Sequence, residues 1–94
     1  MRITVEFLGM PAVSDVVGKK KLEVDPSGST VKDVIDELIK RYGKKVKDAF
    51  YPDGNFDLMI QIAIEGKYFI AADKHDTPLH EGDSLTFMML IAGG

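Results

Sequence analysis

The chain has 94 residues, of which 45% are hydrophobic and 29% charged, a balance typical of one globular domain rather than a disordered segment. Its 15 acidic and 12 basic residues give a net charge of −3, which argues against nucleic acid or an anionic membrane as the main partner. The absence of cysteine excludes disulfides, thiolate metal sites and a cysteine nucleophile, and no apolar run approaches the length of a membrane span. We expect a soluble cytoplasmic protein, because the first residues alternate instead of forming a signal-peptide core.

Alternating apolar residues predict two strands near the start of the chain. Ile3, Val5 and Phe7 share one face of the first strand. Residues 9–18 are rich in turn-forming residues and predict a loop or a wide hairpin turn. Residues 20–24 predict a second short strand, which we expect to pair antiparallel with the first.

Residues 31–42 carry the strongest helical pattern. Six apolar side chains recur at helical spacing and form one stripe: Val31, Val34, Ile35, Leu38, Ile39 and Tyr42. Thr30 is the predicted N-cap, and Asp33 favours the first turn through the helix dipole. Gly43 is placed to form a left-handed C-terminal cap.

After this helix, the pattern predicts one more helical turn around Val46 and Phe50, followed by a loop and three strands. The three strands are predicted over residues 59–64, 68–70 and 84–90.

The predicted order is β-β-α-β-β-β, an α+β design in which a mixed sheet of four to five strands packs on one main helix. The first and last strands are strongly apolar on their inner faces, which suits neighbouring positions at the centre of the sheet. Pairing the chain ends in this way gives the β-grasp arrangement of ubiquitin-like domains. We expect a single domain over residues 1–94, with residues 91–94 as a flexible C-terminal tail.

No group of residues predicts a catalytic site or a metal site. His75 and His80 lie in a polar stretch without a surrounding motif, and we expect solvent-exposed or capping roles for both. Neither a phosphate-binding glycine loop nor a nucleophile elbow is present. The basic run Lys19-Lys20-Lys21 is typical of a charged strand edge that blocks aggregation rather than of a binding patch.

The pair Gly93-Gly94 carries the chemistry. Glycine has no Cβ, so an extended Gly-Gly tail can enter a channel that other residues would block. Gly94 would then present an unhindered α-carboxylate, which ATP can convert into an acyl-adenylate with AMP as the leaving group. A sulfur nucleophile would replace AMP to leave a thiocarboxylate, whereas an amine would form an amide bond.

These features together resemble the MoaD/ThiS family of ubiquitin-like sulfur carriers, which includes the small subunit of molybdopterin synthase. The resemblance is carried by residues 3–8, 29–35, 64–66, 77–85 and 92–94. Its most specific part is the Pro-Leu-x-x-Gly-Asp pattern at positions 78–83, followed by a strand and Gly-Gly. Position 65 is glutamate where these carriers often have asparagine.

The resemblance implies that a ubiquitin-activating-type enzyme adenylates Gly94, which is then thiocarboxylated, while Gly93 gives the tail access to the partner's site. That partner would consume ATP, and this chain would hold no cofactor of its own. A sulfur-transfer large subunit, or another sulfur acceptor enzyme, would be the second partner. The chain would be a co-substrate or small subunit rather than an enzyme by itself, and we expect its sulfur to enter molybdopterin, the pterin of the molybdenum or tungsten cofactor.

Apolar residues on the outward face of the predicted sheet indicate a partner surface, to which the residues before the diglycine belong. The predicted partner-binding residues are Leu8, Tyr68, Met88, Leu90, Ile91 and Ala92. If residues 44–58 cover this face, however, the same side chains are simply core.

Three other functions fit the same features. The carrier could serve thiamine or cysteine synthesis, or it could be a ubiquitin-like modifier joined through Gly94 to lysines of other proteins. It could also be a non-catalytic β-grasp binding module with an inert tail.

Overall fold

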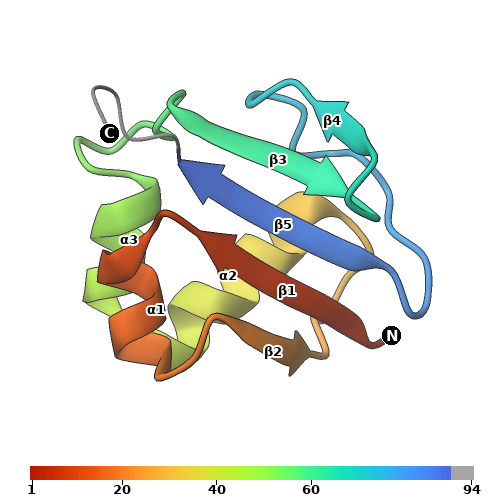
Figure 1. The fold of residues 1–94 in the computed structure, drawn as a ribbon, viewed down its shortest axis with the longest axis horizontal. Coiled ribbons are helices and arrows are strands. Elements are labelled where there is room, and N and C mark those ends of the chain that lie inside the picture. The colour runs from red at the N-terminus through yellow and green to blue at the C-terminus, as the bar shows by residue number, and fades with distance from the viewer. Residues whose placement is uncertain (90–94) are drawn as a thin grey trace.

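A mixed five-stranded sheet forms one layer of the structure, and helices form the other (Figure 1). The computed structural model of the chain describes residues 1–89. In chain order, its elements are β1 (Ile3–Leu8), α1 (Pro11–Val17), β2 (Lys21–Val24), α2 (Val31–Tyr42), α3 (Lys44–Phe50), β3 (Ile60–Ile64), β4 (Tyr68–Ile70) and β5 (Ser84–Met89). The α+β class and the main helix are confirmed, whereas the predicted continuation of the last strand to residue 90 lies outside the described residues.

The strands lie in the order β2-β1-β5-β3-β4. The central pair, β1 and β5, is parallel, with Val5 opposite Leu85 and Phe7 opposite Phe87. The other three pairs are antiparallel, including the predicted hairpin of β1 and β2. The expectation that the first and last strands are central neighbours is therefore confirmed, and β2 and β4 form the two edges of the sheet.

An aromatic contact ties α3 to the same face of the sheet as α2. Helix α2 buries Val31, Val34, Ile35 and Leu38 completely. The Phe87 ring of β5 packs edge-on against Phe50 of α3, with ring centroids 5.0 Å apart. Burying each of these side chains contributes roughly 1.5–3 kcal/mol to folding. All of this apolar packing lies on one side of the sheet, and Figure 1 shows α2 on that side, passing behind β1 and β5.

A reciprocal cap fixes the start of α2. The Thr30 hydroxyl accepts a hydrogen bond from the Asp33 N–H at 3.3 Å, and the Asp33 carboxylate accepts from the Thr30 N–H at 3.0 Å and the Thr30 hydroxyl at 2.8 Å. Gly28 leaves room for that carboxylate, because a Cβ at this position would collide with it. The predicted N-cap is confirmed, and its partner is Asp33.

The end of α2 differs from the prediction. Gly43 has φ 85° and ψ −154°, so its φ is positive but its conformation is not the left-handed helical one. The reason is that α3 begins at the next residue, and Gly43 both ends α2 and precedes α3. The predicted extra helical turn around Val46 and Phe50 is confirmed as α3.

The prediction of a loop or wide turn over residues 9–18 is wrong, because α1 occupies most of this segment. Pro11 stands in the first turn, where its missing N–H leaves no helical hydrogen bond unmade. Gly18 ends the helix in the left-handed conformation, and its N–H donates to the Ser14 carbonyl at 2.8 Å. Val13 is the only fully buried residue that the structure describes in this helix.

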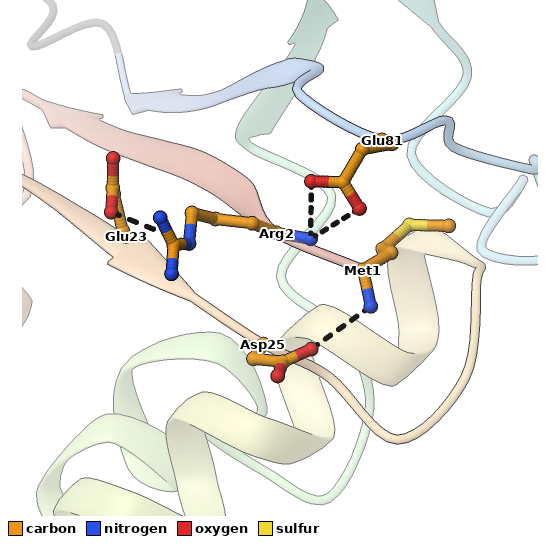
Figure 2. Close-up of polar contacts among 5 residues, drawn as sticks. All are labelled: Met1, Arg2, Glu23, Asp25 and Glu81. Atoms are coloured by element: carbon orange, nitrogen blue, oxygen red, sulfur yellow. Dashed lines mark hydrogen bonds and ion pairs between the residues drawn. The ribbon is translucent and has the colours of Figure 1, made fainter.

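Polar contacts hold the first residues of the chain in place (Figure 2). The Arg2 N–H donates to both carboxylate oxygens of Glu81, at 3.1 and 3.2 Å. The Met1 ammonium group lies 3.0 Å from Asp25, whose hydrogen bond and charge raise the pKa of that amino group. The Arg2 side chain points toward Glu23, with Nε and Oε2 3.6 Å apart. These contacts join β1 to β2 and to the loop before β5.

The segment that carries the Pro-Leu-x-x-Gly-Asp pattern has a structural role. Leu79 is buried, and its N–H donates to the Ser29 carbonyl at 2.7 Å, just before α2. The Gly82 N–H donates to the Arg2 carbonyl at 2.8 Å, and the Asp83 carbonyl accepts from the Thr4 N–H at 3.0 Å. This segment therefore joins the start of the main helix to the start of the central strand pair.

We expect the cap of α2 to make stability depend on acid pH. Thr30→Ala should lower the free energy of unfolding by about 1 kcal/mol. The Thr30 hydrogen bonds hold the pKa of Asp33 below its usual value of 3.8. The ionised Asp33 carboxylate therefore contributes fully to the free energy of unfolding above pH 3.8, and this contribution is lost as pH falls through the folded-state pKa. The difference between wild type and Asp33→Asn, measured by urea unfolding, should be constant near neutral pH and shrink in acid.

Asp36→Asn is the matched control on the same helix. Asp36 makes an exposed ion pair with Lys32, so its loss should cost no more than about 0.5 kcal/mol. A wild-type to Asp33→Asn difference that stays unchanged down to about pH 2 would contradict the capping role.

Candidate functional site

The strand pair β1–β5 fixes the point where the predicted tail begins. Both strands end at the same side of the sheet, where α1 and α3 lie (Figure 1), and Leu8 is opposite Met88. Gly9 follows with φ +66°, and a Cβ on it would collide with the Met89 carbonyl oxygen. The backbone of Met89, the last described residue, is therefore packed directly against Gly9.

Five predicted site residues, Leu90, Ile91, Ala92, Gly93 and Gly94, lie outside the described residues. What the structure adds is their starting point. Beside Met89 there is an apolar hollow of about 170 Å³, to which Gly9, Val13 and Ala49 contribute. Met89, after which the predicted tail begins, is thus bounded by the end of β1 on one side and by helices α1 and α3 on another.

The face of the sheet opposite α2, here called the outer face, carries Leu8 and Met88 as predicted. Ile3, Val5 and Phe7 point toward the helices and are buried, so the alternate residue Leu8 points to the outer face and is 40% exposed. Met88 lies beside it on β5 and is partly buried. The two side chains are neighbours at the end of β5 from which the chain continues to residue 90.

The sequence predicts Tyr68 on this face, and that placement is wrong. Tyr68 is opposite Ile64, and Ile64 is opposite the buried Leu85, which places all three on the helix-facing side. Phe69 is opposite Ala63 and therefore occupies the outer face, with 62% of its surface exposed. Tyr68 is also exposed, at 66%, because β4 is an edge strand beyond the cover of the helices.

Leu8, Met88 and Phe69 form what we call the outer patch. Between them lie Ala63 and Thr86, two small side chains of the central strands. The patch is extended at the start of β3 by an open groove of about 350 Å³, whose lining carries no ionisable side chain among the described residues. This groove is lined by Leu58, Ile60, Gln61, Phe69, Ile70 and Ala72.

The alternative in which residues 44–58 cover this face does not hold. Helix α3 packs through Val46 and Phe50 onto the helix side of the sheet. Leu58 and Met59 are 73% and 65% exposed and bury little. Exposed apolar side chains grouped on one face of a sheet are typical of interaction sites, so the outer patch is the candidate partner surface.

The two histidines have different environments. The His80 side chain is exposed, and the main-chain N–H of His80 donates to the Asp83 carboxylate at 2.8 Å. His75 is partly buried with its ring edge-on to Phe56, centroids 4.3 Å apart, so it is not exposed, but its carbonyl oxygen accepts a hydrogen bond from the Lys32 N–H in the first turn of α2 at 2.9 Å, as the expected capping role requires. Residues 1–89 contain no group of three His, Cys, Asp or Glu side chains placed to hold a metal ion. Within the same residues, no helix is long and apolar enough to cross a bilayer.

Sequence reasoning missed two residues of this site. The outward position of Phe69 follows from the pairing of Ile64 with Tyr68 across the turn, which is the signal that could have revealed it. The role of Gly9 depends on its contact with Met89, and the sequence gives no signal of that contact.

The central parallel pair of chain-end strands, with one main helix packed on the sheet, defines a β-grasp, ubiquitin-like protein. Among solved structures, SAMP1 from Haloferax volcanii superposes with a TM-score of 0.79 and 21% identity, covering 100% of both chains. The ThiS family profile matches residues 12–94, and the chain belongs to the ThiS family. A search of curated protein sequences finds no match.

Two further solved structures have the same fold. A putative molybdopterin converting factor subunit 1 from Pyrococcus furiosus matches with a TM-score of 0.67 and 20% identity, covering 97% of this chain and 99% of that one. A chain of the BexX/CysO complex from Amycolatopsis orientalis matches with a TM-score of 0.72 and 21% identity, covering 98% and 99%. The chain thus has the fold of ubiquitin-like sulfur carriers and modifiers.

We expect Gly9→Ala to disturb the root of the tail. Gly66 offers a matched control, because its φ of +65° nearly equals the +66° of Gly9 but no atom lies within 4 Å of its would-be Cβ. Gly66→Ala should cost only the left-handed strain, about 1–2 kcal/mol. Gly9→Ala should cost more in urea unfolding and shift the NMR amide signals of Met88 and Met89. Equal losses with unchanged Met89 signals would contradict the close packing.

Proposed function

We propose that this protein is a sulfur carrier whose Gly94 carboxylate is adenylated by a ubiquitin-activating-type enzyme and converted into a thiocarboxylate. The observation that carries the proposal is the ThiS family match, which extends through Gly93 and Gly94. The fold supports it, because the end of β5 emerges beside an exposed apolar face that a partner enzyme can bind.

The reaction divides into two steps. A carboxylate oxygen of Gly94 attacks the α-phosphorus of ATP, so a C–O–P bond forms and pyrophosphate leaves. Hydrosulfide released by a sulfur donor then attacks the acyl carbon, the C–S bond forms, AMP leaves with the bonding electron pair, and the sulfur-bound proton is lost. The product is a thiocarboxylate. The partner binds ATP and supplies the catalytic groups, and this chain supplies the acyl group and the surface that positions it.

The length of the tail limits where the partner binds. Residues 90–94 span at most about 18 Å when fully extended. An enzyme that acts on Gly94 must therefore place its active site within this distance of Met89. Leu8 and Met88 lie beside that residue, so the outer patch is the surface that such an enzyme can contact while the tail reaches its active site.

We further propose that the sulfur enters molybdopterin in the cytoplasm, through a sulfur-transfer large subunit that binds the same outer patch. The similarity to the putative molybdopterin converting factor subunit 1 supports this pathway. The similarity to a chain of the BexX/CysO complex supports a different sulfur acceptor, and a thiamine or cysteine pathway would use the same activated tail.

A second candidate is a protein modifier, which the TM-scores of 0.79 and 0.76 to two small archaeal modifier proteins support. In that case, a lysine amine attacks the same Gly94 adenylate, AMP leaves, and an isopeptide bond forms. Activation is common to both functions, and the second nucleophile distinguishes them.

We expect the purified chain to gain mass when incubated with ATP, its activating enzyme and a sulfur donor. Replacement of one oxygen of the Gly94 carboxylate by sulfur adds about 16 Da, which intact-mass spectrometry resolves. A variant with one phenylalanine added after Gly94 should gain nothing, because its carboxylate is displaced and a bulky side chain enters the channel.

The outcome is decisive in either direction. Full function of the extended variant without trimming would overturn the role of Gly94. Adducts to protein lysines, without any thiocarboxylate, would assign the modifier function instead.

We expect the outer patch to bind the activating enzyme. Phe69→Asp and Leu8→Asp should each weaken that complex about tenfold or more, because they place a charge at the centre of an apolar interface. Tyr68→Asp is the matched control, since Tyr68 is on the same strand and equally exposed but faces the helix side. Isothermal titration would measure the three dissociation constants. If Tyr68→Asp weakened binding as much as Phe69→Asp, the outer face would not be the docking surface.

A further inference from the structure

The β2 edge of the sheet has main-chain hydrogen-bonding groups that face away from β1. The β1–β2 register pairs Val5 with Leu22 and continues to Phe7 and Lys20, where the Phe7 N–H donates to the Lys20 carbonyl at 2.8 Å. Hydrogen-bonded and non-bonded pairs alternate in an antiparallel ladder. The N–H and C=O groups of Lys21 and Glu23 therefore point to the free edge, because β2 has only β1 as a neighbour.

An open groove of about 530 Å³ runs between this edge and the end of α2. Lys19 and Lys21 line it from the β2 side, and Arg41 and Tyr42 line it from α2. The Arg41 guanidinium group lies 5.9 Å from the centre of the Tyr42 ring, which is within the range of a cation–π contact.

The groove contains three cations, those of Lys19, Lys21 and Arg41. None of them takes part in an ion pair within residues 1–89. Glu23 also lines the groove, but its carboxylate is paired with Arg2 at 3.6 Å. The groove is therefore cationic on a protein whose formal net charge is −3. Such a local reversal of sign attracts an acidic partner.

We propose that the β2 edge binds an extended acidic segment of another protein, which adds to the sheet as a further strand. Its main chain pairs with the free N–H and C=O groups of Lys21 and Glu23, and its carboxylates lie against Lys19, Lys21 and Arg41. Strand addition supplies affinity through the main chain, and the charges supply selectivity. The inference is independent of the chemistry at Gly94.

The lysines define which strand this edge accepts. A second copy of the chain pairing through β2 would bring two lysine-bearing strands together, and like charges on opposing strands destabilise a ladder. The other edge, β4, has only three residues and exposes Tyr68 and Phe69 rather than cations. The expectation that Lys19-Lys20-Lys21 blocks aggregation agrees with this selectivity, since the same charges that repel a copy of the chain attract an acidic strand.

The test uses the full chain and one synthetic probe, the acetylated and amidated peptide Asp-Val-Glu-Val-Asp-Val-Glu. We expect NMR amide shifts centred on Lys21, Leu22 and Glu23, with slower hydrogen exchange at the Lys21 and Glu23 amides. The double variant Lys19→Glu/Arg41→Glu should bind the probe about tenfold more weakly. Lys67→Glu/Lys74→Glu makes the same charge change away from the groove and should bind like wild type, apart from a small long-range effect that salt screens.

A second pair of variants separates strand addition from charge attraction. Glu23→Gln removes one negative charge and keeps the edge N–H, so it should bind the acidic probe at least as well as wild type. Glu23→Pro removes the same charge and also the N–H, and an edge position tolerates proline when that N–H faces solvent. It should bind about threefold to tenfold more weakly than Glu23→Gln. Thermal unfolding of both variants checks their folding, and the hydrogen-exchange result stands independently of them.

Three outcomes would overturn the proposal. The first is binding of the probe without protection of the Lys21 and Glu23 amides. The second is equal weakening by the Lys67→Glu/Lys74→Glu control. The third is full displacement of the probe by inorganic phosphate at the same concentration, which would show attraction of small anions without strand addition.

Discussion

The parallel pairing of β1 with β5 is the constraint on which the rest of the structure depends. These strands lie near opposite ends of the chain, and parallel neighbours can be joined only by a long crossover, so everything between them must fold around the pair. The loss of chain entropy is offset by burial of apolar side chains at the centre of the sheet, where Phe7 and Phe87 stack with centroids 6.3 Å apart. The same pairing brings Met89 beside Leu8 and Gly9, so the start of the tail has a fixed position relative to the outer patch.

Most of the residues that carry the family resemblance support this pairing. Leu79 is buried, and Gly82 and Asp83 hydrogen-bond to the first residues of β1. Glu65 has φ 57°, a left-handed conformation that asparagine adopts more readily than glutamate. Here the Glu65 carboxylate accepts a hydrogen bond from the Ser84 N–H, and the main-chain N–H of Glu65 donates to the Ser84 carbonyl at 2.8 Å. These two bonds hold the turn to the start of β5. The departure from the family's usual residue is therefore compensated within the fold.

Elements with a wide apolar stripe could be predicted from the sequence, and short elements could not. Helix α2 has both a stripe and a cap, so its bounds and its N-cap were predictable. Helix α1 has seven residues and buries only Val13 completely among them, so the sequence predicts a turn around Pro11 and Gly18, although these residues begin and end a helix. In β4 all three residues are apolar, so alternation says nothing about their faces, and the register across the preceding turn places Phe69 outward. Leu8 and Met88 were predictable because their strands alternate clearly, whereas the contact of Gly9 with Met89 joins distant parts of the chain.

The folded surface has to provide whatever selectivity for partners this protein shows. Gly93 and Gly94 have no side chains, so they cannot distinguish this protein from any other chain that presents the same diglycine to an enzyme. Solved structures with 20–21% identity have the same fold, which leaves most surface positions free to differ. Differences in partner must then arise where side chains are exposed near the tail or along the sheet edges. In this chain, those places are the apolar outer patch around Leu8, Met88 and Phe69 and the cationic groove beside β2. Because the two surfaces lie on different parts of the sheet and differ in chemistry, one partner can engage the tail through the first while another occupies the second.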